Sequence, residues 1–284
     1  MDHDREPWRR LRKSALAALG VLSGLVLQPQ SGGSQEVVDV ELVLAVDVSL
    51  SMSQDELEIQ RRGYAAALAH EDVVNAVLEG AHGRIAVTYF EWAGEFTQSV
   101  VVPWTTIASR EDAVRLAERL SANPPSSARR TSISGALGFA ADLLAESGYR
   151  GLRRVVDVSG DGPNNQGPPV TPARDRLTEQ GVTINGLPLM TSGGLATSFD
   201  VEDLDIYYRD CVIGGPGAFM IPVNDWSQFP EAVRRKLVIE LAGKPMEPPE
   251  GEGGVHFVLA QASAVDCLIG EKMWQNRSWM YRDS

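Results

Sequence analysis

Three oxygen-bearing side chains follow an apolar run near the start of the chain. The segment VVDVELVLAV leads into DVSLSM, which places Asp47, Ser49 and Ser51 at alternating positions. In an extended segment, alternate residues point to the same side. A carboxylate at the end of a buried strand is costly unless it is hydrogen-bonded, paired or bound to a cation. This spacing predicts a cation site beyond the first strand.

Helix capping is the alternative role for these side chains, because Ser and Asp often cap the helix that follows a strand. Ser53 and Glu56, however, already match the capping-box pattern S-x-x-E for that helix. Capping therefore leaves the three earlier side chains without a role, which favours the cation site.

Two other segments carry oxygen donors at similar places. Thr131 lies in RRTSISGAL, just before a predicted helix, and Asp161 follows the apolar run in VVDVSGDGPNN. Together with the first segment they supply five hard oxygen donors and no His or Cys, which disfavours zinc and copper. A site with few charged ligands suits magnesium best, and manganese or calcium remain compatible.

Predicted strands and helices alternate along the chain, and their arrangement would bring these donors together. The expected strands span residues 40–49, 84–93, 97–107, 152–160, 182–190 and 218–223, and the expected helices span 53–78, 109–122, 132–147, 172–181, 201–214 and 226–243. This alternation predicts a doubly wound α/β fold, with a mostly parallel six-stranded sheet and helices on both faces. A break near Gly63 is expected in the first helix. Ligands of such sheets bind beyond the carboxyl ends of the strands, where the strand order reverses.

The three segments resemble the metal-ion-dependent adhesion site (MIDAS) of von Willebrand factor A (VWA) domains. The resemblance rests on D-x-S-x-S in DVSLSM, on TSISGAL and on SGDG, and it covers roughly residues 37–243. The whole chain also resembles an exported bacterial family of VWA-like proteins of unknown function.

The resemblance implies a role for each donor. Asp47, Ser49 and Ser51 would hold the metal, Thr131 would bind it directly or through water, and Asp161 would act through water. An Asp or Glu carboxylate of a protein partner would complete the coordination. The function implied is that of a binding module and not of an enzyme.

Four further residues are candidates for the rim of the site. Arg129 and Arg130 stand where many VWA domains have glycines, and they either attract an acidic ligand or are solvated loop charges. Asp157 alternates with Asp161 along the strand, and it lies either near the metal or hydrogen-bonded in the core. Asn164 either borders the site or forms the turn.

Composition and motifs narrow the function classes. The net charge of −12 disfavours a nucleic-acid binder. The sequence lacks the common motifs of nucleophilic, nucleotide-binding and zinc-peptidase sites. A metal-dependent hydrolase remains an alternative, with Asp157 or Asp161 as its base. A structural envelope protein with a vestigial metal site is another.

The ends of the chain indicate export. Residues 1–34 combine a basic cluster, a short apolar run and a polar stretch, as in a signal peptide or an N-terminal anchor. We expect a periplasmic or cell-envelope protein that contacts a membrane only if this segment is not cleaved. The VWA-like domain would span 35–243, a linker 244–254 and a C-terminal extension 255–284. Cys211 and Cys267, the only cysteines, predict a disulfide, although two separate buried thiols are the alternative.

Overall fold

We describe a computed structural model of the chain, which covers residues 35–191, 201, 203–242, 256–257 and 265–280. The predicted signal peptide or anchor (1–34) and the linker (244–254) lie outside the described residues. Within the described part, none of the helices is both long and apolar enough to cross a membrane.

The first strand forms the centre of the sheet because apolar residues occupy both of its faces. Val40 and Leu42 belong to the core cluster on one face, whereas Val43 and Ala45 belong to the cluster on the other face. A strand that is apolar on both faces is typical of a parallel sheet covered by helices on both sides.

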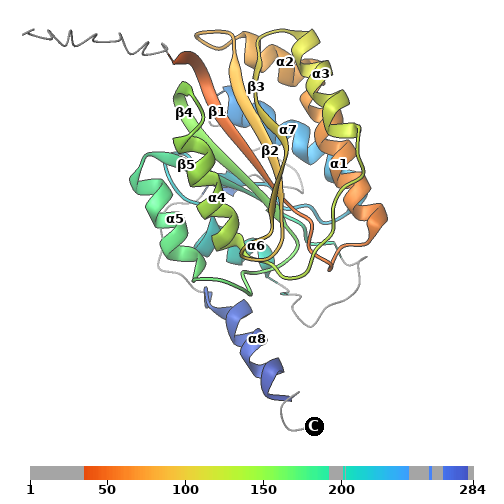
Figure 1. The fold of residues 1–284 in the computed structure, drawn as a ribbon, viewed down its shortest axis with the longest axis vertical. Coiled ribbons are helices and arrows are strands. Elements are labelled where there is room, and N and C mark those ends of the chain that lie inside the picture. Colours follow the sequence, from red (N-terminus) through yellow and green to blue (C-terminus); the bar gives the residue numbers. More distant parts are fainter. Residues whose placement is uncertain (1–34, 192–200, 202, 243–255, 258–264, 281–284) are drawn as a thin grey trace, which may run out of the picture. The chain divides into compact units, whose positions relative to one another are not determined.

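The sheet has the strand order β3-β2-β1-β4-β5-β6-β7. The strands β2, β1, β4, β5 and β6 run parallel to one another, and β3 and β7 are antiparallel edge strands. Figure 1 labels the strands β1 to β5. The prediction of a mostly parallel six-stranded sheet is confirmed, and the C-terminal extension adds a seventh strand of two residues. The strands are β1 (Glu36–Asp47), β2 (Ile85–Trp92), β3 (Gln98–Ile107), β4 (Tyr149–Gly160), β5 (Val182–Pro188), β6 (Phe219–Met220) and β7 (His256–Phe257).

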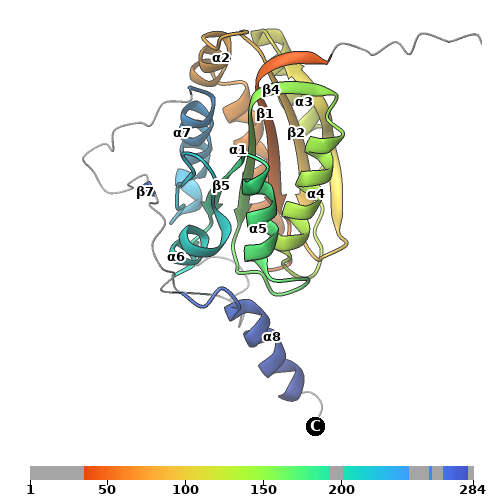
Figure 2. The same cartoon turned by 90° about the vertical axis from the view of Figure 1, so that its left-hand side faces the viewer.

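Helices cover both faces of the sheet (Figures 1 and 2). Helices α1, α2, α3 and α7 pack on one face, and α4, α5 and α6 pack on the other. The helices are α1 (Gln54–Leu68), α2 (Glu71–Leu78), α3 (Arg110–Ser121), α4 (Ile133–Ala145), α5 (Val170–Glu179), α6 (Leu204–Tyr207), the π-helix η1 (Tyr208–Val212), the 3-10 helix η2 (Trp226–Gln228), α7 (Phe229–Ala242) and α8 (Ile269–Met280).

The expected break near Gly63 is wrong. Helix α1 continues through Gly63 and ends at Leu68, and α2 begins after His70. A Cβ atom at Gly63 would lie 2.6 Å from the ring of Phe229 in α7. The glycine is therefore explained by close packing between two helices and not by a turn. The capping box of Ser53 and Glu56 at the start of α1 is confirmed.

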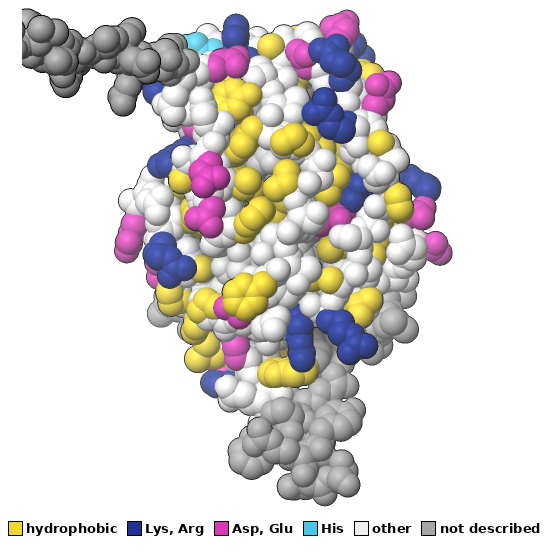
Figure 3. Space-filling view, viewed as in Figure 1, with side chains coloured by type: hydrophobic (Ala, Val, Ile, Leu, Met, Phe, Trp, Pro, Cys, Tyr) yellow, Lys and Arg dark blue, Asp and Glu magenta, His cyan; other side chains and the backbone are white. Residues whose placement is uncertain are grey.

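The C-terminal extension is attached to the domain by the predicted disulfide. Cys211 in η1 and Cys267 before α8 are bonded, with their Cα atoms 5.5 Å apart. One face of the molecule is mixed in character. Acidic, basic and hydrophobic side chains are interspersed over the face shown in Figure 3.

The strand order reverses beside β1. From β1 the chain passes through α1 and α2 to β2 on one side, and it later returns to β4 on the other side of β1. The carboxyl ends of β1 and β4 therefore mark the switch point of the sheet, where ligands of open α/β sheets bind. Asp47 ends β1, and Asp161 directly follows β4.

Candidate metal centre

The loop after β1 is organised around the carboxylate of Asp47. Asp47 is fully buried, and its Oδ1 accepts a hydrogen bond of 2.8 Å from the backbone N–H of Ser49. The hydroxyls of Ser49 and Ser51 lie 2.9 Å apart, which places them on one side of the loop. Gln60 of α1 also holds the end of β1, because its Nε2 donates a hydrogen bond of 2.8 Å to the backbone carbonyl of Asp47.

The loop after β4 meets this first loop through its acidic side chain. The hydroxyl of Ser51 donates to Oδ1 of Asp161 at 2.8 Å, and that of Ser49 lies 3.4 Å from the same oxygen. The structure therefore brings together the ends of β1 and β4, which the sequence predicted to supply oxygen donors to one site.

Thr131 is held next to Ser51 and Asp161 by Asn165, which lies three residues after Gly162. Its N–H donates to Oδ1 of Asn165 at 3.0 Å, and the N–H of Asn165 donates to its carbonyl at 2.8 Å. Ser132 caps α4 by accepting a hydrogen bond from the N–H of Gly135. A cavity of about 300 Å³ opens here, lined by Ser49, Leu50, Ser51, Arg129, Arg130, Thr131, Asp161, Gly162, Asn165 and Trp274.

The second oxygen of Asp47 is an unsatisfied buried acceptor. Among the described residues, Oδ2 of Asp47 has no hydrogen-bond partner. Burial, followed by the nearby charge of Asp161, raises the pKa of Asp47 well above its ordinary value. A buried carboxylate oxygen without a partner is costly, and a bound cation would remove that cost. The donor set at this site therefore fits a divalent cation.

Next to the carboxylate of Asp47, position 160 at the end of β4 has room only for glycine. A Cβ atom at Gly160 would lie 2.9 Å from Oδ2 of Asp47 and 2.8 Å from the hydroxyl of Tyr208. Tyr208 belongs to η1, and burial together with the charges of Asp47 and Asp161 raises its pKa. The position of the Asp47 carboxylate thus depends on a close backbone approach at the end of β4.

The candidate rim residues fall in different places. Arg130 has left-handed backbone geometry, with φ of 80°, and its guanidinium lies over the ring of Trp274 in α8. Arg129 is exposed at the mouth of the cavity. Asn164 does not line the cavity; its Oδ1 accepts from the N–H of Ser134, and its Nδ2 donates to Glu271 of α8.

Asp157 lies in a separate buried cluster. Its Oδ1 is 2.6 Å from Nζ of Lys236 in α7, and both side chains are buried. Lys236 also pairs with Glu240, which accepts a hydrogen bond from Asn185. The pKa of Asp157 is raised to about 7, because the effect of burial exceeds the opposing effect of Lys236. Neither Asp47 nor Asp157 lines the cavity, but Asp157 already pairs with a cation, Lys236, whereas Asp47 contacts the loop hydroxyl residue Ser49.

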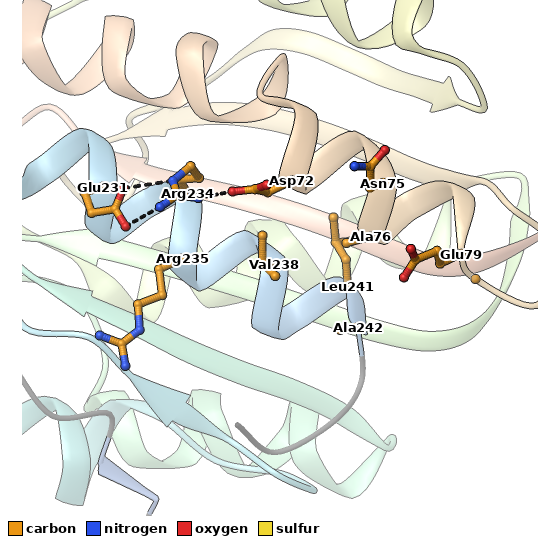
Figure 4. Close-up of a pocket in the computed structure, with 11 residues that line it drawn as sticks. Asp72, Asn75, Ala76, Glu79, Glu231, Arg234, Arg235, Val238, Leu241 and Ala242 are labelled. Atoms are coloured by element: carbon orange, nitrogen blue, oxygen red, sulfur yellow. Dashed lines mark hydrogen bonds and ion pairs between the residues drawn. The ribbon is translucent and has the colours of Figure 1, made fainter. Parts of the chain in front are cut away.

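A larger hollow lies between α2 and α7 (Figure 4). Its volume is about 590 Å³, and Arg234 within it pairs with Asp72 and Glu231. The candidate donors for a metal do not line this hollow.

The sequence singled out neither Gln60, Gly160 nor Trp274 for the site. A search for clustered acids, His and Cys would also miss it, since no group of three or more such side chains suited to a metal occurs among the described residues. The feature of the sequence that indicates this site is its hydroxyl groups, which provide most of the candidate oxygen donors.

Comparisons with known proteins identify the family and the fold. A family model described as "Protein of unknown function (DUF1194)" matches residues 36–245. No curated protein matches the sequence significantly.

Several solved structures are similar in fold. Proximal thread matrix protein 1 from the mussel byssus, whose structure is described as having a zinc-occupied MIDAS motif, has a TM-score of 0.51 at 17% identity over 73% of this chain and 49% of that chain. The pilus adhesin SpaC from Lactobacillus rhamnosus GG has a TM-score of 0.52 at 11% identity over 73% of this chain and 31% of that chain. A von Willebrand factor type A protein from Catenulispora acidiphila has a TM-score of 0.47 at 16% identity, over 74% and 44%.

This chain spans about half the length of the first of these proteins. At such identities the likeness shows the fold alone, and it agrees with the sheet and helices described above. The chain belongs to the DUF1194 family, and its domain has the VWA fold.

Proposed function

We propose that this protein is an exported binding module that holds a divalent cation and uses it to bind a carboxylate of a protein partner. The observation that carries the proposal is the buried Asp47, whose Oδ2 has no partner among the described residues. It lies at the carboxyl end of β1, next to the loop hydroxyls and Asp161.

Magnesium is the cation that we expect, because the donors are hydroxyls, two carboxylates and water. Asp47, Ser49 and Ser51 would hold it, with Thr131 and Asp161 completing the protein side. Manganese and calcium also take oxygen ligands and remain compatible. Neutral hydroxyl ligands leave the cation strongly attractive to an outside anion.

The charge around the cavity supports an acidic ligand. Two carboxylates, Asp47 and Asp161, offset the two guanidinium groups of Arg129 and Arg130, so a bound divalent cation leaves the site positive. The chain as a whole carries a net charge of −12. Attraction of an acidic partner is therefore local, since the overall charge repels it at long range.

The hydrolase alternative is weaker on this geometry. Such an enzyme needs a general base within reach of water at the cation. Asp157 pairs with Lys236 away from the cavity, and Asp161 accepts the hydrogen bond of Ser51. The likeness in fold to a pilus adhesin, SpaC, also favours a binding role.

Export to the periplasm or cell envelope fits the disulfide between Cys211 and Cys267, because disulfides persist in oxidising compartments. The basic and apolar segment in residues 1–34 supports the same assignment.

The proposal is tested by capture from cell-envelope extracts on the immobilised protein. We expect a partner that is retained in magnesium, released by EDTA and lost with Asp47→Asn. An excess of N-acetyl-aspartate amide should compete with it. A partner retained equally in magnesium, in EDTA and by Asp47→Asn would contradict the proposal.

A further inference from the structure

Helix α8 contributes a side chain to the metal-site cavity. Trp274 lines that cavity together with Ser51, Thr131 and Asp161, although it lies in the C-terminal extension. The guanidinium carbon of Arg130 is 3.3 Å from the centre of the Trp274 ring. The extension is therefore part of the candidate binding surface.

Helix α8 is docked closely onto the domain at its beginning. Asn164 donates to Oε1 of Glu271 at 2.8 Å. A Cβ atom at Gly270 would lie 2.1 Å from the carbonyl oxygen of Asn164, so the helix touches the backbone of the loop that follows β4. The disulfide of Cys267 ties the segment just before the helix to η1.

Stacking fixes Arg130 without using its hydrogen-bond donors. A guanidinium group that lies over an aromatic ring keeps its N–H groups at the edge of its plane, where they can bind a carboxylate in bidentate fashion. Among the described residues, neither Arg129 nor Arg130 forms an ion pair. Arg130 has a left-handed backbone with φ of 80°, a geometry that is unfavourable for most residues other than glycine.

A second cavity adjoins the first at this stack. It has a volume of about 260 Å³, and Arg130, Asn165 and Trp274 line both cavities. Gln166, Gln275 and the carboxyl group of Glu271, which accepts the hydrogen bond of Asn164, add polar groups to its wall. A ligand that binds the cation in the first cavity can therefore extend past Arg130 into the second cavity.

We propose that Arg130, held by Trp274, is a second recognition point for the ligand. The preferred ligand is then an acidic peptide segment with two nearby carboxylates, one for the cation and one for the guanidinium. This inference rests on the proposed function, because the first carboxylate binds the cation.

Synthetic peptides with blocked ends test this inference on the full chain in magnesium. The probes are Gly-Asp-Gly-Gly-Gly, Gly-Asp-Asp-Gly-Gly and Gly-Asp-Gly-Asp-Gly, and their affinities are measured by calorimetry. We expect at least one two-acid peptide to bind about tenfold more tightly than the one-acid peptide, as one charge-assisted bidentate contact warrants. Arg130→Gln and Trp274→Leu should each remove this advantage, because each should weaken the two-acid peptide about tenfold more than the one-acid peptide.

Arg150→Gln is the matched control, because Arg150 is an exposed arginine at the beginning of β4, the end opposite Asp161. It should preserve the advantage. If one-acid peptides bind only with magnesium and a second acid adds nothing, or if its advantage survives Arg130→Gln, this inference is wrong while the proposed function stands. If no peptide binds in a magnesium-dependent way, the proposed function fails and this inference with it.

Discussion

Ser51 donates a hydrogen bond of 2.8 Å to Oδ1 of Asp161, which lies 110 positions further along the chain. The contact exists because β1 and β4 are parallel neighbours whose carboxyl ends meet at the switch point of the sheet. Two loops that are distant in sequence thereby form a single cluster of oxygen donors around the buried Asp47.

Gly160→Ala should weaken magnesium binding without unfolding the domain. The added Cβ would lie 2.9 Å from Oδ2 of Asp47, so the carboxylate must move away from its position in the site. We expect a loss of about tenfold or more in affinity, which corresponds to about 1.4 kcal/mol. Gly138→Ala is the control, since a Cβ at that position in α4 meets nothing within 4 Å. Equal affinities for the two variants would show that Gly160 does not position Asp47.

Magnesium affinity should fall as the pH is lowered. Burial and Asp161 raise the pKa of Asp47, and only its ionised form binds a cation. Calorimetric titrations between about pH 8 and pH 5 should show a decrease that begins above the ordinary range of a carboxyl group.

The raised pKa of Asp47 has a different effect on stability when EDTA removes the cation: magnesium affinity falls at lower pH, but the stability of the cation-free fold rises. The native carboxyl of Asp47 keeps a proton that the unfolded chain has already released, so the free energy of unfolding should rise as the pH falls through the raised pKa. Asp47→Asn should remove this contribution in urea titrations. An identical pH dependence in the variant would contradict it.

Lys236→Ala should destabilise the fold strongly. Lys236 is fully buried between Asp157 and Glu240, and its removal leaves two buried carboxylates without a cation. Breaking such a cluster costs about 3–5 kcal/mol. Urea denaturation measures the loss, and Lys272→Ala, which removes an exposed lysine, should change stability by at most about 0.5 kcal/mol.

The structure also separates this cluster from the candidate metal site. Asp157→Asn should therefore leave magnesium affinity nearly unchanged, whatever its effect on stability. A loss of affinity comparable to that of Asp47→Asn would instead place Asp157 in the site.

Cys211→Ser combined with Cys267→Ser should lower the free energy of unfolding. The bond joins residues that are 56 positions apart, and closing a loop of this length contributes about 4 kcal/mol in the chain-entropy model. Amide hydrogen exchange should increase first in α8, because the disulfide ties the segment before that helix to η1. Unchanged exchange in α8 would show that its other contacts suffice.

The sequence was sufficient to predict the fold, because apolar periodicity is a local pattern. The five oxygen donors, which the D-x-S-x-S spacing and two later segments suggested, stay a prediction. The sequence was not sufficient for residues whose role depends on tertiary packing. Gly63 looked like a helix break, but Phe229 from a distant helix explains it. Asp157 shares the strand periodicity of Asp161, but Lys236 from α7 reaches it in the core.

Trp274 shows a further limit of local patterns. It lies 113 positions beyond Asp161 in a tail without clear periodicity, and the disulfide and the docking of α8 bring it to the cavity. The contact between Asn165 and Thr131 likewise forms only when the two loops meet.

Calorimetric titration of magnesium into the full chain and into Asp47→Asn tests the central claim most directly. The account predicts that the wild type binds the cation and that the variant, folded by circular dichroism, loses the heat of binding. Asp142→Asn, an exposed acid on α4 with the same change of charge, should bind as the wild type does. Equal magnesium affinity in the wild type and Asp47→Asn would contradict the account.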